Sequence, residues 1–414
     1  MSMPLGLYVH IPFCERKCLY CDFLSFTADD DAKELYVDLL VDELKQWDGI
    51  LSEGLAASQK FTIKTVFIGG GTPTCLSADE LIRIGNAIRN MKIFSNTDLD
   101  KNSYSGDVLS DSNKACGVEY TIEMNPGTVL DTHIAAFKEM GVNRISLGLQ
   151  SAQNEELKIL GRIHDWEGFV KCYMSLREHG FDNLNVDLMS AIPGQTYAGY
   201  KDTLEKVLAL KPEHISAYSL IVEPETPFAA MQDAGELLLP DEDEDREMYV
   251  LTKQLLKQHG LHRYEISNYS LPEKECSHNL AYWSGGSYLG VGLGASSYIN
   301  KKRWHNPDNM KDYRRLVLDK TLIKNTMGMA ASLSVKEQME EYMFLGMRKT
   351  KGISESGFLS EFGVTLNHVY GDVLGRLLGD NLLEQSGDYI YLTERGIDVS
   401  NMVLSEFLLD NYVD

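Results

Sequence analysis

The chain has 414 residues, of which 43% are hydrophobic, and a formal net charge of -22. This length is enough for two or three domains, and the composition is that of an ordinary globular protein. No apolar run reaches the roughly 18 residues that a membrane span needs, and the first residues lack the basic and apolar regions of a secretory signal. An acidic chain without a Lys/Arg cluster repels phosphate backbones, so we expect no nucleic acid partner.

The seven cysteines are unevenly placed. Three of them, Cys14, Cys18 and Cys21, fall within one short segment, and the other four are scattered. A disulfide framework spaces its cysteines more evenly and belongs to smaller chains. The pattern predicts a reducing compartment and a metal site. We therefore expect a cytoplasmic protein; a transit segment removed from the chain would direct it to an organelle instead.

Short β-rich runs alternate with helical patterns in the first half of the chain. The expected strands are Leu7–Ile11, Thr65–Ile68, Glu119–Glu123, Arg144–Leu149, Asn185–Leu188 and Ile215–Leu220. Six such units predict a parallel sheet, because each return to the same edge needs a crossover helix. Six fall short of the eight that close a full barrel. Residues 1–222 are therefore expected to form a partial (β/α)6 barrel of the α/β class, with its functional groups at the carboxyl ends of the strands.

The helical patterns between the strands carry two local signals. In Ala32–Trp47 one face is apolar and includes Leu35, Leu39, Leu40 and Leu44. Ser77 and Glu80 have the spacing of a capping box and open another helix.

The rest of the chain divides by composition. Residues 94–117 are rich in Ser, Asn and Asp and are expected to be a surface insertion. Residues 223–328 show a mixed α/β pattern. Residues 329–414 are mostly helical, with a hairpin expected over Asn381–Thr393 and its turn at Gly387 and Asp388. Helices followed by a small hairpin suggest a winged-helix-like module.

The three clustered cysteines have the spacing C-x3-C-x2-C just after the first strand. Cysteine thiolates hold iron–sulfur clusters. Three thiolates reach three corners of a [4Fe–4S] cube, and the fourth iron then stays open to another ligand, as in catalytic metal sites. S-adenosylmethionine (SAM) chelates such an iron through its amino nitrogen and carboxylate. The alternatives are unrelated cysteines or a zinc site, whose fourth ligand would have to be a residue such as His10, in an expected strand.

Five further segments occur in the same order as in one known family. They begin at Tyr8 (YVHIPFC), Gly69 (GGGTPT), Glu123 (EMNPG), Ser146 (SLGLQS) and Asn185 (NVDLMSAIPGQT). Together with the cysteine motif, they resemble the oxygen-independent coproporphyrinogen III oxidase family of the radical-SAM superfamily. The resemblance covers most of residues 5–350 and is far more specific than the cysteines alone.

This resemblance implies a set of SAM-binding residues. They are Tyr8, Tyr20, Gly70, Gly71, Thr72, Glu123, Gln150, Arg162 and Asp187. The glycines lack side chains, so the backbone can approach SAM closely, and Glu123 is placed to accept from ribose hydroxyls or the amino group. Taken singly, each has a simpler explanation, because a Gly-rich turn is weak evidence and a lone Glu, Gln or Arg is more often a solvated surface residue.

Two departures distinguish branches of this family. The decarboxylating oxidases carry a cysteine two residues after the third cluster cysteine and a long N-terminal extension, whereas this chain has Phe23 there and begins close to its first strand. The segment from His278 to Trp283 has the pattern H-N-x-x-Y-W. Both features resemble the HemW-type heme chaperones. The resemblance implies heme as cargo and a heme-accepting apoprotein as partner, and a membrane-associated partner is one option.

The heme ligand and the reaction stay open at this point. An imidazole beside Tyr282 and Trp283 offers an iron ligand and flat apolar surface, which makes His278 the candidate heme ligand. A structural histidine among buried aromatic residues is the alternative, and Cys276 and His305 are other candidate ligands. No catalytic residue is assigned. The competing function is that of a coproporphyrinogen III oxidase that uses a 5′-deoxyadenosyl radical.

A glycine-rich run begins at Gly290 (GVGLGASS). It also resembles the family, and we expect it to close over the SAM site. Dinucleotide binding is the other reading of such a run, but no βαβ unit frames it.

Overall fold

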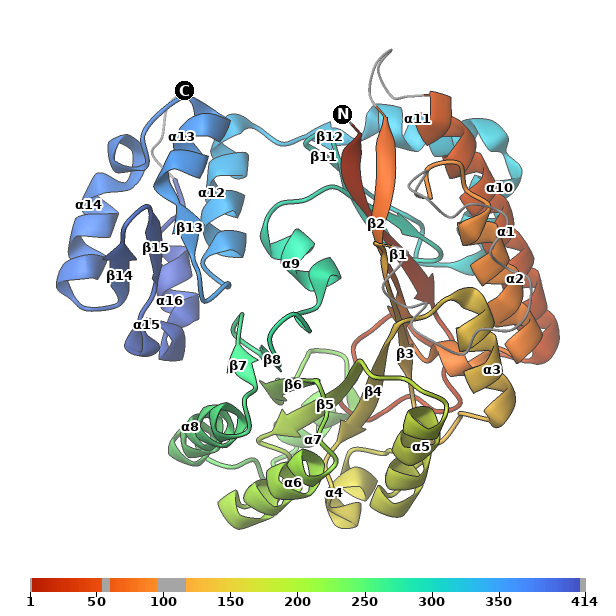
Figure 1. Cartoon of the computed structure of the whole chain (residues 1–414), viewed down its shortest axis with the longest axis horizontal. Helices are drawn as coiled ribbons and strands as arrows, with labels where there is room; N and C mark the ends of the chain where they lie inside the picture. The colour runs from red at the N-terminus through yellow and green to blue at the C-terminus, as the bar shows by residue number, and fades with distance from the viewer. Residues whose placement is uncertain (1, 54–59, 95–116, 410–414) are drawn as a thin grey trace.

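The structure, a computed structural model, describes residues 2–53, 60–94 and 117–409 (Figure 1). The insertion expected at 94–117 lies outside the described residues, apart from its two end residues. Within the described ranges, no helix is both long enough and apolar enough to cross a membrane.

Six parallel strands stand side by side in chain order and form the centre of the molecule, as the sequence predicts. They are β1 (Met3–Ile11), β2 (Phe61–Gly70), β3 (Glu119–Met124), β4 (Arg144–Gln150), β5 (Leu184–Ser190) and β6 (His214–Ser219). Their apolar residues are buried against both the barrel interior and the surrounding helices, as is usual for parallel strands.

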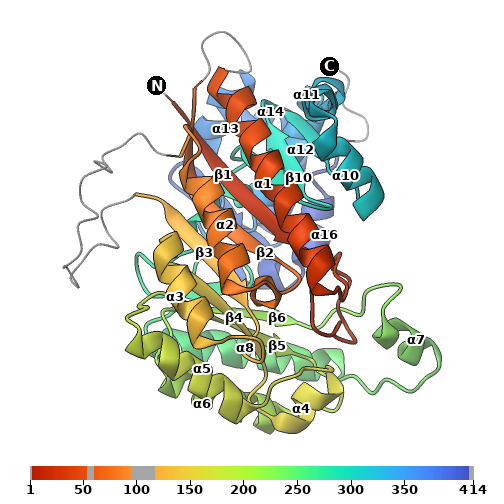
Figure 2. The ribbon, with the colours of Figure 1, turned by 90° about the vertical axis from the view of Figure 1, so that its right-hand side faces the viewer.

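Six helices follow these strands and cover the outer face of the sheet (Figure 2). They are α1 (Asp30–Glu53), α2 (Ala78–Arg89), α3 (Asp131–Met140), α4 (Asn154–Ile159), α5 (Trp166–Glu178) and α6 (Tyr197–Ala209). The short 3₁₀ helix η1 (Pro73–Cys75) precedes α2. The capping box expected at Ser77 and Glu80 is present at the start of α2.

One detail of the expected packing of α1 is wrong. Leu39, Leu40 and Leu44 are buried, but Leu35 is 39% exposed. Successive helical residues are rotated by about 100°, and Tyr36, which is fully buried, takes the inward position beside Leu35. The tyrosine ring therefore occupies the space that the sequence pattern assigned to the leucine.

The extension at 223–328 does not stand apart, because its strands continue the central sheet on both sides. Next to β1 come β9 (Tyr288–Val291, parallel to β1), β10 (Ser296–Ile299) and β11 (Lys302–His305); next to β6 come β8 (Asn268–Ser270) and β7 (His262–Arg263). Beyond the expected boundary at residue 328, β12 (Ala331–Ser332) pairs with β11 and ends the sheet on the β1 side. The helices of this part are α7 (Pro227–Asp233), α8 (Glu242–Gln258), α9 (Ser277–Trp283), α10 (Met310–Leu318) and α11 (Lys320–Met329). The partial barrel is thus the middle of a wider mixed sheet.

The C-terminal part has its own hydrophobic core. Its elements are α12 (Val335–Gly346), β13 (Ile353–Ser354), α13 (Glu355–Phe362), α14 (Leu366–Gly379), β14 (Leu383–Ser386), β15 (Tyr389–Leu392), α15 (Glu394–Asp398) and α16 (Ser400–Ser405). The expected hairpin is formed by β14 and β15, and Gly387 in its turn has φ +59°. With β13 it makes a three-stranded sheet beside the helices, an arrangement that matches the winged-helix-like prediction.

Candidate functional site

A loop between β1 and α1 carries the three clustered cysteines. The loop is closed at its base, because the Cys14 amide donates to the Phe26 carbonyl and the Phe26 amide donates to the Pro12 carbonyl. Cys14, Cys18 and Cys21 are all partly exposed and line the same cavity, which has a volume of about 580 Å³. The loop lies at the carboxyl end of β1, where a parallel barrel places its functional groups.

The thiols have polar partners that suit an iron–sulfur cluster. The Arg162 Nη1 atom lies 3.5 Å from Cys18 Sγ, and Thr72 Oγ1 lies 3.6 Å from Cys14 Sγ. Hydrogen bonds to cluster sulfurs are among the factors that set a cluster's potential. No group of three or more His, Cys, Asp or Glu side chains in the described part of the chain is arranged to hold a metal ion. The fit therefore rests on three thiolate donors on one loop and on these two partners.

The glycine-rich loop after β2 packs directly against the cysteine loop. The Gly71 amide donates to the Ile11 carbonyl, and a Cβ added at Gly71 would lie 2.6 Å from the Phe13 carbonyl oxygen. At Gly70 the backbone has φ +110°, and a Cβ would lie 2.4 Å from the His10 ring. The glycines are thus required by their contacts with the chain itself, in addition to any approach to SAM.

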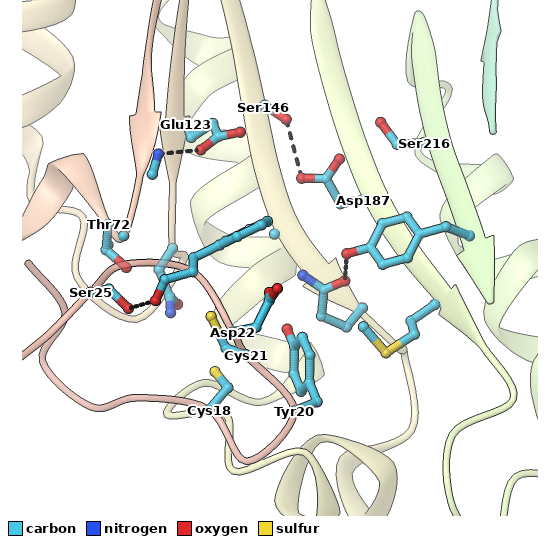
Figure 3. A pocket seen from close by; sticks show the side chains of 18 of the residues that line it. Cys18, Tyr20, Cys21, Asp22, Ser25, Thr72, Glu123, Ser146, Asp187 and Ser216 are labelled. Atoms are coloured by element: carbon cyan, nitrogen blue, oxygen red, sulfur yellow. Dashed lines mark hydrogen bonds between the residues drawn. The ribbon is translucent and has the colours of Figure 1, made fainter. Parts of the chain in front are cut away.

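A buried carboxylate stands beside this loop. Glu123, at the end of β3, accepts the Gly70 amide at 3.1 Å. Burial, with a further contribution from the charge of Asp187, raises the pKa of Glu123 to about 7. Burial also raises the pKa of Asp187, which accepts from Asn185 and from Ser146; the bond to Ser146 is drawn in Figure 3. Two carboxyl groups therefore face the cavity from neighbouring parts of the sheet.

Gln150 and Arg162 also line the cavity. Gln150 has φ +74°, a strained backbone for a residue other than glycine, and its Oε1 atom accepts from the Tyr218 hydroxyl. Arg162 donates to the Gly148 carbonyl at 2.5 Å. Tyr20 projects into the cavity from the cysteine loop (Figure 3). Backbone strain held by neighbouring contacts is a feature of binding sites.

The structure brings together all but one of the residues expected to bind SAM. The cavity is lined by Tyr20, Gly70, Gly71, Thr72, Glu123, Gln150, Arg162 and Asp187. Tyr8 is not among the lining residues, because its hydroxyl is held 2.9 Å from His10 Nδ1. Both His10 nitrogens are engaged, since Nε2 bonds to the Leu24 carbonyl, so His10 is not free to serve as a zinc ligand.

Several lining residues were missed by the sequence analysis. They include Phe67, Arg144, Ser146, Asn185, Ser216, Tyr218, Ile221 and Asn279. A signal for some of them was present: Arg144, Ser146, Gly148 and Gln150 alternate along β4, and alternate strand residues share a face. Gln150 was identified, and its strand mates follow from this period of two.

His278 lies behind the wall of the cavity rather than inside it. The side chain is 3% exposed, its Nδ1 lies 2.8 Å from Thr65 Oγ1, and its ring packs on Phe67 with centroids 5.3 Å apart. Burial, with a smaller effect of the Arg144 charge, lowers the pKa of His278 to about 3. Its Nε2 atom has no hydrogen-bond partner among the described residues. The His278 ring does not line the cavity, whereas Phe67, on which it packs, does.

Each of the two aromatic rings of the same motif is half-buried and has one face against a neighbouring side chain. Tyr282 stacks on Tyr288 with centroids 4.2 Å apart, and the Arg348 guanidinium lies 4.4 Å from the centre of the Trp283 ring. One face of each ring is therefore occupied, and neither ring lines the cavity. That these rings offer flat apolar surface to a macrocycle stays a prediction. The rings contact β9 and the end of α12, and α9 joins the barrel to the C-terminal part.

The glycine-rich run at Gly290 does not close over the cavity, contrary to expectation, since none of its residues lines it. The Gly292 amide donates to the buried Glu43 carboxylate at 2.8 Å. A Cβ at Gly292 would lie 2.5 Å from the Tyr36 hydroxyl and 2.7 Å from the His10 carbonyl oxygen. The run supports the end of β1 from outside, below the cysteine loop.

Comparison with known proteins agrees with this site. A sequence profile of the Radical SAM superfamily matches residues 8–207, and one of the HemN C-terminal domain matches residues 333–399. Over 100% of this chain and 91% of the other, the structure is similar to that of the coproporphyrinogen III oxidase HemN from Escherichia coli, a radical SAM enzyme, with a TM-score of 0.80 and 21% identity. Fold and site thus define a radical SAM protein, whose fold implies a [4Fe–4S] cluster and SAM.

Comparison with related sequences shows to which family of radical SAM proteins the chain belongs. The heme chaperone HemW of Bacillus subtilis (strain 168) is 35% identical over 402 residues, covering 97% of this chain and 98% of that protein. HemW of Lactococcus lactis subsp. lactis (strain IL1403) is 35% identical over 411 residues, covering 99% of each. HemW of Escherichia coli (strain K12) is 30% identical over 414 residues, covering 98% and 99%. The chain belongs to the HemW family.

Proposed function

We propose that the chain holds a [4Fe–4S] cluster on Cys14, Cys18 and Cys21, binds SAM beside it, and carries heme to an apoprotein in the cytoplasm. The observation that carries this proposal is the full-length relationship to the heme chaperones named above. The cavity supports it, because the cysteine loop and eight of the nine expected SAM residues line one space.

The residues around the cavity have separable roles in this proposal. When bound, the cluster supplies an open iron for the amino and carboxylate groups of SAM. Glu123 and Asp187 accept hydrogen bonds from the ligand, Tyr20 packs on its adenine, and Arg162 holds Cys18 and the Gly148 carbonyl in place. Tyr8 acts through His10, which ties β1 to the Leu24 carbonyl of the cysteine loop.

The mouth of the cavity favours heme carriage over decarboxylation. Phe23 occupies the position at which the decarboxylating oxidases carry a cysteine, and it is 62% exposed. Ile221, two residues past the end of β6, also lines the cavity and is 69% exposed. Two large apolar side chains at the entrance suit a flat, mostly apolar ligand, and a thiol that the oxidases possess is missing here.

The SAM site is tested by EPR titration of the reduced, reconstituted protein with SAM. The titration is done at pH 8, where Glu123 is ionised because its pKa is about 7. Glu123→Gln keeps the shape of the side chain and removes this charge, so SAM affinity is expected to fall about tenfold, the usual effect of losing a charge-assisted hydrogen bond. Glu205→Gln, on the exposed face of α6, is the matched control. Equal affinities in the two variants would place SAM away from Glu123.

The chaperone function is tested by three measurements on the same protein. Hemin titration is expected to give a saturable Soret shift, transfer to an apo-heme protein is expected to restore that protein's activity, and coproporphyrinogen III with SAM is expected to remain unconverted. Robust conversion to protoporphyrinogen IX without saturable hemin binding would overturn the proposal and establish the oxidase.

A further inference from the structure

Deep in the cavity, one guanidinium is buried without a hydrogen bond. Arg144 begins β4, is 2% exposed, and lines the cavity. Its guanidinium makes no hydrogen bond to any other described residue, and the Nε atom is buried without a partner. Burying a charged group without hydrogen bonds costs several kcal/mol. Such a group is expected to meet an anion when the cavity is filled.

The nearby carboxylates are engaged by other donors. Glu119 accepts the amides of Ser277 and His278 at 2.7 and 2.9 Å and so fixes the start of α9. Asp187 accepts from Asn185 at 2.7 Å and from Ser146 at 3.1 Å. Both carboxylates offset part of the Arg144 charge from a distance, but neither accepts a hydrogen bond from its guanidinium. The unsatisfied groups here are therefore donors, which call for an acceptor from a ligand.

The position of Arg144 separates it from the expected SAM contacts. Seven residues of β4 run from Arg144 to Gln150, and strands rise about 3.3 Å per residue. The backbone of Arg144 therefore lies about 20 Å from that of Gln150 along the strand. Gln150 is at the carboxyl end, where the cysteine loop also lies, and Arg144 is at the amino end. In the sheet register Arg144 pairs with Thr121 and Ser146 pairs with Glu123, so Arg144 lies two residues nearer the amino ends of the strands than the buried glutamate.

We infer that the Arg144 guanidinium forms a carboxylate-binding subsite at the floor of the barrel. Ser146, Asn185 and Ser216 border this subsite, and their side-chain donors are already engaged within the chain. All four residues line the cavity. A guanidinium presents paired N–H donors in a plane that matches a carboxylate. The floor subsite takes the carboxylate of a ligand that enters past the cysteine loop, and a heme propionate is the source that the proposed function supplies.

The test compares hemin with hemin dimethyl ester, in which both carboxylates are blocked. The wild-type protein is expected to prefer hemin, and Arg144→Met is expected to weaken hemin binding tenfold to a hundredfold while leaving ester binding unchanged. Arg144→Lys keeps the charge without the planar fork, and it should retain part of the preference. Equal weakening of hemin and ester in Arg144→Met would overturn the subsite, because that pattern reports only a disturbed fold.

A structural control and a second probe keep the outcomes distinct. Arg177→Met breaks the ion pair with Glu213 outside the cavity; it should lower stability but keep the preference for hemin. Acetate should raise the melting temperature of the wild type and not of Arg144→Met.

If hemin does not bind but acetate still acts through Arg144, the carboxylate subsite is supported and the proposed heme carriage is wrong. If Arg144→Met weakens SAM and leaves hemin and acetate unaffected, Arg144 serves SAM and the inference is wrong.

Discussion

The two ends of the parallel barrel use similar residue types for different purposes. At the carboxyl ends, the cysteine loop, Glu123 and Gln150 surround open space. Toward the amino ends, α9 brings His278, Tyr282 and Trp283, but each of these rings is already packed against the chain. The comparison teaches that a histidine and two aromatic rings in a signature motif do not by themselves make a ligand site. What distinguishes the two groups of residues is whether their side chains border the cavity, which His278, Tyr282 and Trp283 do not.

The largest expected effect belongs to the cysteine loop. Changing Cys14, Cys18 or Cys21 to Ser should remove the cluster, reducing anaerobically reconstituted protein from about four irons per chain to nearly none, because the remaining two thiolates cannot hold the cube. Iron and sulfide assays measure this. Cys172→Ser, on α5, should keep full iron content. Wild-type iron in all three loop variants would contradict the assignment of this end of the barrel.

The next largest effect is a pH dependence of stability, which should have opposite signs for Glu123 and His278. In the SAM-free protein, Glu123 keeps its proton up to about pH 7, whereas the unfolded chain releases it near pH 4.3. This contribution to stability is complete below the unfolded pKa and is lost as pH rises toward 7. Relative to Glu123→Gln, the wild type should lose about 2 to 3 kcal/mol between pH 5 and pH 8.

Urea unfolding of both proteins at these two pH values measures that loss. A difference in stability that does not vary with pH would mean that Glu123 is ionised throughout, and the carboxyl end would then be less desolvated than its burial indicates.

His278 should respond in the opposite direction. Its pKa is lowered by burial, so its contribution is complete above the unfolded pKa of about 6.5 and is lost as pH falls. His278→Ala should cost on the order of 2 kcal/mol at pH 7 through the lost bond to Thr65 and the cavity left behind. Hemin spectra should not change. His179→Ala, on an exposed residue, is the control, and a shifted Soret band in His278→Ala would show that heme reaches the imidazole.

The smallest effect concerns the cavity mouth. Phe23→Ser should weaken hemin binding about fivefold, or roughly 1 kcal/mol, through lost apolar contact. Leu130→Ser is a matched control, because Leu130 is 63% exposed and does not line the cavity. If both variants bind hemin as tightly as the wild type does, the macrocycle does not contact Phe23 at the entrance of the cavity.

The sequence predicted the central part of the fold well because that part is local and periodic. The six strands, the capping box of α2 and the C-terminal hairpin follow from spacing alone. The pairing of β9 with β1 could not be predicted, since four residues far along the chain carry too little pattern to identify a partner.

Part of the site could also be predicted from local sequence patterns. Residues in continuous motifs, such as Cys14 and Gly71, were found from the sequence. Arg144 was not found from the sequence. It stands out only because its guanidinium makes no hydrogen bond while the acids around it accept from other donors. The covering of Trp283 by Arg348 likewise joins separate segments. Absent or occupied partners are properties of three-dimensional packing, which no local pattern encodes.

The placement of β9 beside β1 has a consequence for biosynthesis. Gly6–Val9 of β1 pair with Tyr288–Val291, and chains emerge from the ribosome from the N-terminus onward. One edge of the first strand therefore has no native partner until most of the chain has been made, and an unpaired strand edge invites association with other chains. Gly292, which supports the His10 backbone, arrives just as late. The cysteine loop accordingly gains its final support near the end of synthesis, which favours cluster insertion after translation over insertion during it.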